Sequence, residues 1–439
     1  MPRRRSASSL LVYLNGQLVG RLTRRASGAI EFQYNPGWLG NARAMPVSLS
    51  LPLREDRYIG DTVVAVFENL LPDDRSLRER LAARVGADGP DAYSLLSVIG
   101  RDCVGALQFL PEGVSPGKVG EIRGTPLKDA DVARIVRSLH ENPLGISLEE
   151  DEEFRISLAG VQEKTALLFH RGRWYRPKGT TATTHILKPP IGQRGDHLDL
   201  SQSVENEHVC LRLTAVLGLP TAESRIEDFG GKPVLVVKRF DRLWTKDHRL
   251  LRLPQEDCCQ ALGVPPARKY TSDGGPGIRE ILRLLQGSDD PRTDRRLFLK
   301  AQIVFWLLAA IDGHAKNFSL HLFPGGRFRL APLYDVLSAQ PLVDTGQLAG
   351  KQVKLVMPVG TNRHYVVDMI LPRHFEQTAT AAGMGAQEVR EIMDELRETA
   401  AGALDRVLGE VSGEVRDSVG RSIAQGVRSR LEALRGAHR

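Results

Sequence analysis

The chain has 439 residues, of which 26% are charged and 41% hydrophobic, and its formal net charge is +7. This length exceeds one ordinary domain, and the composition favours a soluble globular protein with two or three domains. No apolar run approaches the roughly 18 residues that a membrane span requires, so we expect no membrane-spanning segment.

Cysteine usage and local charge bear on where the protein works. The apolar stretch at residues 10–14 is too short for the core of a secretory signal. The positive charge is denser in residues 3–5 and in the arginines beyond residue 420, where both a solvated basic face and a nucleic-acid contact are possible interpretations.

The four cysteines are Cys103, Cys210, Cys258 and Cys259. We expect reduced thiols in a cytoplasmic protein, because these residues form no Cys-x-x-Cys pair and show no zinc-site spacing with histidine.

An α+β unit is predicted over the first 112 residues. Residues 10–22 predict a β-hairpin, since Asn15-Gly16 is the strongest short turn signal and separates two apolar runs. The segments that follow predict a strand at residues 30–34, helices at 62–71, 76–86 with Ser76 as N-cap and 91–99, and a strand at 105–110. Pro and Gly between residues 111 and 117 then indicate a loop.

A turn of small residues follows the acidic run at residues 149–153. Residues 154–158 and 165–168 predict two strands around this turn, whose backbone N–H groups could cover phosphates. The turn has a single glycine, Gly160, and lacks both G-x-G-x-x-G and the Walker pattern. By itself it therefore favours an ordinary hairpin.

Lys188 ends a short predicted strand at residues 185–188, which two prolines stop. A lone lysine on a strand is usually a solvated edge residue, but here it could neutralise the α- and β-phosphates of a nucleotide. A helix is predicted from residue 198 to about 217 with a hydroxyl N-cap, and its Glu205 or Glu207 could pair with Lys188, as in kinases. Residues 233–242 predict a buried strand and a charged connector, where the hinge of a kinase would bind adenine.

Asp312 and Asn317 lie five positions apart, after a long apolar run of helical periodicity that ends at Ile311. In kinases an Asp at this spacing accepts the proton of the attacking hydroxyl, and the Asn holds magnesium. Asp335, at the end of the apolar strand-like segment 330–335, suits a second magnesium ligand. An ordinary turn also explains Asp-Gly followed by His and Asn, but Lys, Asp, Asn and Asp in this order favour a phosphotransfer site. Further helices are predicted at residues 372–382, 387–408 and 414–434.

Several of these segments together resemble the HipA family of bacterial serine/threonine kinase toxins. The resemblance extends over nearly the whole chain, includes residues 69–73, and rests on long motifs in matching order. The motifs are Phe-Arg-Ile-Ser-Leu-Ala-Gly-Val-Gln-Glu-Lys at 154–164, Thr-Thr-His-Ile-Leu-Lys at 183–188, Leu-Pro-Gln-Glu-Asp at 253–257, Lys-Tyr at 269–270, Asp-Gly-Gly-Pro-Gly at 273–277 and Asp-Gly-His-Ala-Lys-Asn at 312–317.

The resemblance implies an α+β, two-lobed protein-kinase-like fold with an N-terminal α/β subdomain and a mainly helical C-terminal lobe. The corresponding division is 1–112 for the N-terminal subdomain, 113–240 for the nucleotide-binding N-lobe and 241–439 for the C-lobe. It also implies ATP and Mg²⁺ as cofactors. The implied roles are a catalytic base, Asp312; metal ligands, Asn317 and Asp335; a phosphate loop of Ala159, Gly160, Val161, Gln162, Glu163 and Lys164; a nucleotide-binding lysine, Lys188; an adenine hinge, Lys238, Arg239 and Phe240; and further nucleotide contacts, His314, Ala315, Lys316 and Tyr334.

Ser157 occupies the autophosphorylation position of the family that the chain resembles. A phosphate there would add nearly two negative charges beside a loop that must hold a triphosphate, so we expect it to expel the loop and inactivate the enzyme. Considered without the resemblance, Ser157 is more simply a residue that caps the turn.

The resemblance further implies partners and a cellular role. It implies a toxin held by a HipB-like helix-turn-helix antitoxin dimer on operator DNA, with a protein substrate, expected to be an aminoacyl-tRNA synthetase, whose phosphorylation stops translation. Two alternatives stay open: a catalytically silent corepressor subunit, and a small-molecule kinase on the same scaffold.

Overall fold

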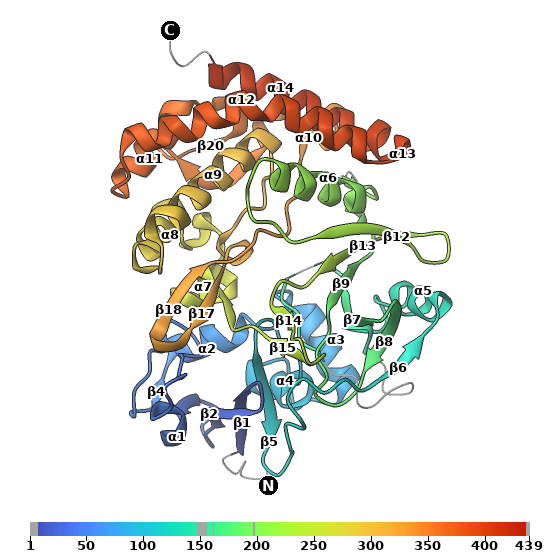
Figure 1. The fold of residues 1–439 in the computed structure, drawn as a ribbon, viewed down its shortest axis with the longest axis vertical. Coiled ribbons are helices and arrows are strands. Elements are labelled where there is room, and N and C mark those ends of the chain that lie inside the picture. The colour runs from blue at the N-terminus through green and yellow to red at the C-terminus, as the bar shows by residue number, and fades with distance from the viewer. Residues whose placement is uncertain (1–7, 147–155, 161, 196–197, 436–439) are drawn as a thin grey trace.

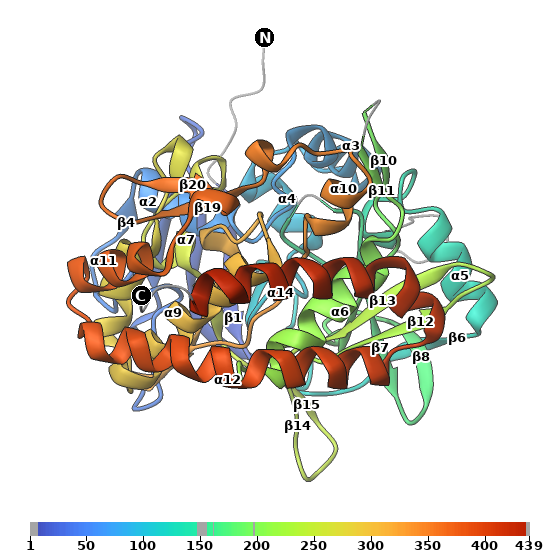
Figure 2. The same cartoon turned by 90° about the horizontal axis from the view of Figure 1, so that it is seen from above.

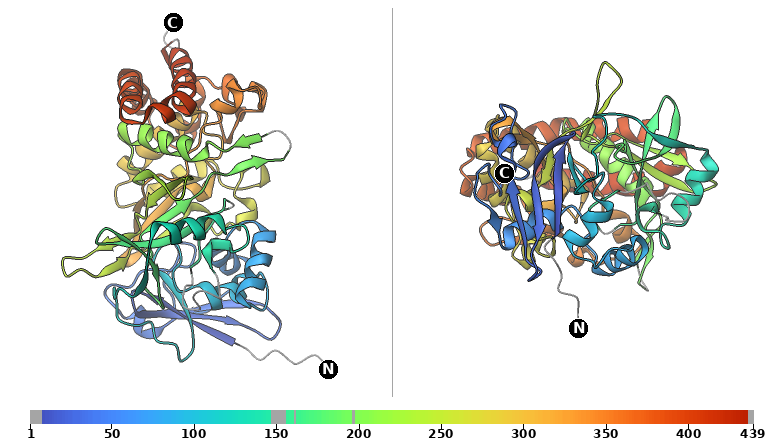
Figure 3. Two further views of the ribbon diagram at one scale, coloured as in Figure 1. Left: turned by 90° about the vertical axis from the view of Figure 1, so that its right-hand side faces the viewer. Right: turned by 90° about the horizontal axis from the view of Figure 1, so that it is seen from below.

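A computed structural model describes residues 8–146, 156–160, 162–195 and 198–435. The N-terminal subdomain, a sheet-based N-lobe and a mainly helical C-lobe follow one another along the long axis (Figures 1 and 3). None of the helices in the described ranges combines the length and hydrophobicity that a membrane span requires. The four cysteines are unpaired and buried, which confirms the expectation of free thiols.

A five-stranded antiparallel sheet in the order β4-β3-β2-β1-β5 forms the N-terminal subdomain. The Asn15-Gly16 hairpin is confirmed, and both turn residues have the positive φ that such a turn needs. Helix α2 packs on the sheet through Phe67, whose ring contacts Phe32 and Phe109. The elements are β1 (Ser8–Leu14), β2 (Gln17–Arg24), β3 (Ile30–Tyr34), α1 (Pro36–Leu39), β4 (Tyr58–Ile59), α2 (Asp61–Glu68), α3 (Arg75–Val85), α4 (Ala92–Ile99) and β5 (Leu107–Pro111).

Helix α3 begins earlier than the sequence suggested. Its N-cap is Asp74, whose carboxylate accepts a hydrogen bond from the Leu77 N–H at 2.7 Å. The predicted cap Ser76 lies inside the first turn and donates to Asp74 instead. The prediction of Ser76 was wrong because both residue types cap well, and the backbone places the carboxylate where the free N–H groups are.

The N-lobe contains a six-stranded antiparallel sheet in the order β12-β13-β9-β7-β8-β6. Strands β9 and β13, both predicted, lie side by side, so Lys188 stands opposite Leu235. The elements are β6 (Gly124–Leu127), α5 (Asp129–Arg137), β7 (Thr165–His170), β8 (Arg173–Pro177), β9 (His185–Lys188), β10 (Gly192–Arg194), β11 (Leu198–Leu200), α6 (Ser203–Val216), β12 (Ser224–Asp228) and β13 (Pro233–Lys238).

Two predictions in this lobe need correction. The described residues 156–158 join no sheet, because Ile156 and Leu158 are buried in the core shared with the N-terminal subdomain and the Ser157 N–H donates to Asp102; residues 154–155 lie outside the described part. Residues 198–200 are strand β11, and helix α6 starts only at Ser203. Pairing with β10 takes precedence there over the helical pattern.

The C-lobe is built around helix α9, which is buried along most of its length. Helices α12 and α14 lie side by side across the far end of the lobe (Figure 2). The elements are β14 (Arg242–Trp244), β15 (Leu250–Arg252), β16 (Gln255–Asp257), α7 (Cys258–Ala261), α8 (Ile278–Leu284), α9 (Pro291–Leu308), β17 (Ser319–Phe323), β18 (Arg327–Leu330), α10 (Gln340–Asp344), β19 (Lys354–Val359), β20 (His364–Val366), α11 (Pro372–Ala381), α12 (Ala386–Glu410), α13 (Gly413–Val415) and α14 (Arg421–Arg435).

The helices predicted beyond residue 370 are confirmed, although a π-helical segment, Arg416–Gly420, interrupts the last one. One hydrophobic core holds the C-lobe together and includes much of α6. A second core extends from the N-terminal sheet into the N-lobe and is continuous across residue 112. The domain boundaries at residues 112 and 240 stay a prediction.

Candidate active site

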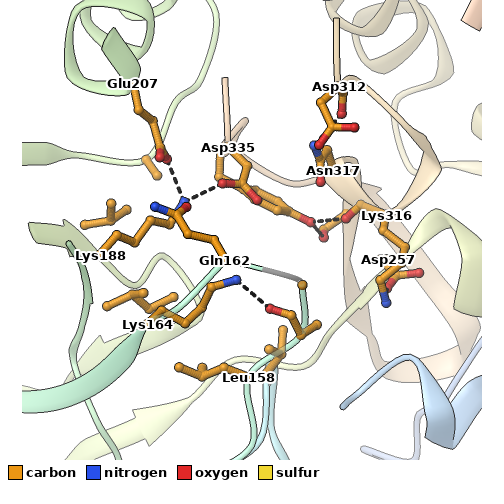
Figure 4. A pocket seen from close by; sticks show the side chains of 18 of the residues that line it. Leu158, Gln162, Lys164, Lys188, Glu207, Asp257, Asp312, Lys316, Asn317 and Asp335 are labelled. Atoms are coloured by element: carbon orange, nitrogen blue, oxygen red, sulfur yellow. Dashed lines mark hydrogen bonds and ion pairs between the residues drawn. The ribbon is translucent and has the colours of Figure 1, made fainter. Parts of the chain in front are cut away.

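A cavity of about 400 Å³ lies where the N-lobe sheet, the C-lobe and the N-terminal subdomain meet (Figure 4). Most of the predicted site residues line it, although they come from segments far apart in the chain. Those lining it are Ala159, Gly160, Gln162, Lys164, Lys188, Lys238, Arg239, Phe240, Asp312, His314, Lys316, Asn317, Tyr334 and Asp335.

The remaining predicted residues are placed differently. Glu163 faces His140, with 3.2 Å between Oε1 and the Nδ1 atom, and is not part of the cavity wall described here. Ala315 is fully buried in the C-lobe core. Val161 lies outside the described residues.

Lys188 is the centre of the ionic contacts in the cavity. Its Nζ atom lies 2.7 Å from Oε1 of Glu207 on α6 and also donates to Asp335 (Figure 4). The partner on the helix is therefore Glu207 rather than Glu205. Burial alone would lower the pKa of Lys188, but the two carboxylates hold it above its ordinary value, so the side chain stays an ammonium ion.

Asp335 has a positive φ of 61°, which is uncommon for a residue with a side chain. The strand-like segment predicted at residues 330–335 is not a strand, since β18 ends at Leu330 and Leu333 forms only a single parallel bridge with Thr221. Although burial opposes it, the cations of Lys188 and Lys164 hold the pKa of Asp335 well below its ordinary value. The side chain is therefore an anion, and 31% of its surface remains exposed.

Asn317 and Asp335 are suited to a divalent cation. The amide Nδ2 of Asn317 donates to the Asp312 carbonyl at 2.7 Å, which leaves the amide oxygen as the ligand atom. Among the described residues, no group of three or more His, Cys, Asp or Glu side chains forms a complete metal cage. One amide and one carboxylate oxygen match Mg²⁺, which commonly takes its remaining ligands from water and phosphate.

Asp312 follows α9, whose C-cap residue Ala309 has a left-handed conformation. The hydroxyl of Tyr270 donates to its Oδ1 at 3.1 Å. The surrounding protein desolvates the carboxylate and raises its pKa to about 6, with Asp335 adding to the rise and Lys269 opposing it. A carboxylate with this pKa is a competent base near neutral pH.

The described residues at the two ends of the predicted phosphate loop, Ala159 and Lys164, are in contact. The ammonium of Lys164 donates to the Ala159 carbonyl at 2.8 Å. Gly160 has φ +99°, a conformation that favours glycine, and a Cβ there would lie 2.5 Å from that ammonium and would displace it. Burial lowers the pKa of Lys164 to about 8. Backbone curled around a lysine suits an anion, as the small-residue turn indicated.

Ser157 is fully buried, and its hydroxyl donates to the Leu70 carbonyl at 2.7 Å. Leu70 belongs to the segment after α2 in the N-terminal subdomain. This segment also reaches the phosphate loop, since the Asp73 N–H donates to the Gly160 carbonyl at 3.2 Å. Ser157 and the loop after it are thus attached to the first subdomain.

The hinge residues differ in what they offer the cavity. Lys238 is largely exposed and pairs with Glu223 at 3.0 Å, whereas the ring of Phe240 lies 5.7 Å from that of Tyr334. The guanidinium of Arg239 is buried and bonds to both oxygens of Asp241. Arg239 therefore supports the hinge with its side chain and has only its backbone left for a nucleotide.

Sequence reasoning gave no role to three charged residues of the cavity, Asp73, Asp257 and Lys269. Lys269 contacts Asp73 at 2.8 Å, and Lys316 contacts Asn69 at 2.7 Å and Asp257 at 3.2 Å. All of these residues lie in segments that resemble the HipA family. Charged residues that stand within apolar or glycine-rich stretches could have indicated that these side chains are buried and paired with one another.

Comparisons with known proteins agree with this geometry. The family model described as the HipA-like C-terminal domain matches residues 156–404, and that of the HipA N-terminal domain matches residues 10–110. A putative kinase, Y4mE of Sinorhizobium fredii, is 36% identical over 93% of this chain and 94% of its own length. The serine/threonine-protein kinase toxin HipA of Shewanella oneidensis is 29% identical over 77% of each chain.

A solved structure also matches. It is that of the toxin–antitoxin system HipA, HipB and its operator DNA complex from Shewanella oneidensis, with a TM-score of 0.79, 25% identity and 96% of each chain covered. The mixed α/β architecture seen here, with the cavity between two lobes, is therefore a kinase-like two-lobed fold.

Proposed function

The chain belongs to the HipA family, and from this premise we propose that it is an ATP-dependent serine/threonine protein kinase acting as the toxin of a toxin–antitoxin pair. The observation that carries the proposal is the contact of Lys188 with both Glu207 and Asp335 in the cavity that Asp312 lines. Kinases require a strand lysine paired with a helix glutamate, and a metal-binding aspartate in place, before transfer.

In the proposed reaction, Asp312 accepts the proton of a serine hydroxyl on the substrate protein. The serine oxygen forms a bond to the γ-phosphorus, the bond to the β–γ bridging oxygen breaks, and ADP leaves. Lys188 binds the α- and β-phosphate oxygens, and the backbone of residues 159–164 covers them. Asn317 and Asp335 would hold Mg²⁺, which supplies charge neutralisation at the phosphates.

ATP turnover by the purified chain tests the proposal. We expect ADP and a phosphoserine product with the parent protein and neither with Asp312→Asn, which preserves shape but removes the base. Phosphoproteomics after a brief induction of the two proteins in cells then identifies the substrate. If the parent chain produces no ADP, a catalytically silent corepressor becomes the better proposal.

The partners follow from the family. The related Shewanella oneidensis structure holds HipA with HipB and operator DNA, and we extend a HipB-like helix-turn-helix dimer and operator DNA to this chain. An aminoacyl-tRNA synthetase is the proposed substrate, with arrest of translation as the consequence. Co-purification with a co-expressed HipB-like protein tests the proposed antitoxin contact. A gel shift of this complex on the operator then tests the proposed DNA contact.

We propose Ser157 as the site of autophosphorylation. Its burial and its bond to Leu70 support a regulatory role, since the hydroxyl must leave this position to receive a phosphate. A dianionic group cannot return to a fully buried site without a cationic partner. Phosphorylation would therefore keep the following loop away from ATP.

A further inference from the structure

Lys269 and Asp73 form an ion pair in the cavity that the reaction described above does not use. The ammonium of Lys269 lies 2.8 Å from Oδ2 of Asp73, and both side chains are more than nine-tenths buried. Lys269 comes from the C-lobe and Asp73 from the segment after α2. The pair therefore joins the N-terminal subdomain to the wall that carries Asp312.

Asp73 is held from several sides. Its backbone N–H donates to the Gly160 carbonyl of the phosphate loop, and its Oδ1 lies 3.5 Å from the ammonium of Lys316. That oxygen is buried and makes no hydrogen bond within the described residues. The carboxylate is thus shared by two cations beside the phosphate loop.

Lys269 is connected to the proposed base through the residue that follows it in the chain. Tyr270, which follows it in the chain, donates to Asp312, and the Lys269 ammonium lies 5.2 Å from the centre of the Tyr270 ring. Its charge opposes the rise that burial causes in the pKa of Asp312. Lys269, Asp312 and Asp73 all line the one cavity.

Among the residues described, three other buried lysines line the cavity, and each has partners of its own. Lys164 donates to the Ala159 carbonyl within the phosphate loop. Lys188 contacts two carboxylates, and Lys316 contacts Asn69, Asp257 and Asp73. Within the part of the chain that the structure describes, Lys269 has Asp73 as its one carboxylate partner within 4 Å. Among the buried lysines on the side of the cavity that carries Asp312, Lys269 is therefore the one best able to bind a further anion.

We propose that Lys269 binds the γ-phosphoryl group of ATP beside Asp312 and that Asp73 is the positioning residue that holds its ammonium there. The inference rests on the proposed kinase function and adds a phosphate-binding residue to it. During transfer, charge spreads over the three outer oxygens of the γ-phosphoryl group, and an ammonium already fixed nearby stabilises that charge without reorganisation. The N-terminal subdomain, through Asp73, then takes part in forming the active site.

The test compares ATP with ADP, because only ATP has the γ-phosphate. Dissociation constants are measured by calorimetry with Mg²⁺ on the full-length chain, in an Asp312→Asn background that prevents turnover. We expect Lys269→Met to weaken ATP binding by roughly tenfold or more, as for a lost hydrogen bond between charged groups, and to change ADP binding by less than about twofold. Lys269→Arg, which retains the charge, should preserve most of the preference for ATP.

Two further variants separate phosphate binding from a structural role. Lys300→Met removes another buried lysine, which pairs with Glu395 at 2.6 Å in the C-lobe. It should lower the melting temperature without changing the ratio of the dissociation constants for ATP and ADP. Asp73→Asn retains Lys269 but no longer holds its ammonium in place. The preference for ATP over ADP should therefore be lower than in the parent and higher than in Lys269→Met. If Lys269→Met does not fold, Lys269→Gln replaces it with the same expectation.

The outcomes are distinct. A purely structural ion pair predicts that Lys269→Met weakens ATP and ADP equally, or weakens neither, and either result overturns the inference. If the parent chain transfers phosphate while Lys269→Met retains its ATP preference, only this inference fails. If the parent chain produces no ADP and Lys188→Met binds ATP as the parent does, the proposed function itself fails.

Discussion

The hydroxyl of Ser157 donates a 2.7 Å hydrogen bond to the carbonyl of Leu70, at a position with no solvent exposure. The bond connects the segment before the phosphate loop to the N-terminal subdomain. Any phosphate on Ser157 requires that this bond break and that the segment move outward. Burial of the Ser157 hydroxyl thus distinguishes the unmodified state from any phosphorylated state of the chain.

Ser157→Ala should abolish autophosphorylation. Intact-mass measurement after incubation with ATP and Mg²⁺ is expected to show an added phosphate on the parent chain and none on the variant. The Leu70 carbonyl loses its donor, so the free energy of unfolding should fall by about 1–3 kcal/mol. A phosphate retained on Ser157→Ala would assign the modification to another residue.

Lys188→Met should lower kcat by at least about a hundredfold, since it removes a preorganised cation from the phosphates. It also leaves Glu207 buried without its partner, which destabilises the fold. Adding Glu207→Gln should therefore restore the melting temperature and leave kcat low. Lys232→Met, at an exposed turn, serves as the control, and an equal loss of activity there would argue against a specific role for Lys188.

Activity should fall as the pH is lowered through about 6. The pKa of Asp312 is raised to about 6, and the base is competent only above this value, as the carboxylate. A profile of kcat/KM against pH for the free enzyme measures this limb. A limb near pH 4, the ordinary value for an aspartate, would show that the pKa of the base is not raised in the free enzyme.

Asp102→Ala should destabilise the fold by roughly 3–5 kcal/mol, as expected when a buried ion network loses one member. Asp102 accepts from Arg242 at 2.8 Å and from Arg252 at 2.9 Å, and it also accepts from Thr183. Its loss leaves buried guanidinium groups uncompensated beneath the hinge. Asp247→Ala, at an exposed ion pair, should leave the unfolding midpoint in urea unchanged, whereas an equal shift in both variants would contradict the argument.

Local patterns in the sequence were sufficient for much of the fold. Asn15-Gly16 allows positive φ at both turn positions, and the period of apolar residues predicted α9, α11 and α12. These features depend on neighbours within a few residues, and the residues themselves carry that information. The start of α3 was misplaced because two good capping residues, Asp74 and Ser76, stand only two positions apart.

The order of Lys188, Asp312, Asn317 and Asp335 along the chain was enough to predict a phosphotransfer site, and the structure brings these four to one cavity. Which glutamate pairs with Lys188 depended on the rotation of α6, and periodicity leaves that open. The side chain of Arg239 turns into a buried network with Asp241 and Asp102, because the N-terminal subdomain packs beneath the hinge.

The sequence by itself determined most of the secondary structure, the kinase-type residues and the resemblance to a family. Only the tertiary structure decided that Ser157 is buried against Leu70 and that Asp73 meets Lys269 beside Asp312. The physical reason is distance along the chain: residues 73 and 269 come together only because two separate hydrophobic cores fix their segments against each other. No short pattern encodes such a contact, since it depends on the packing of the whole molecule.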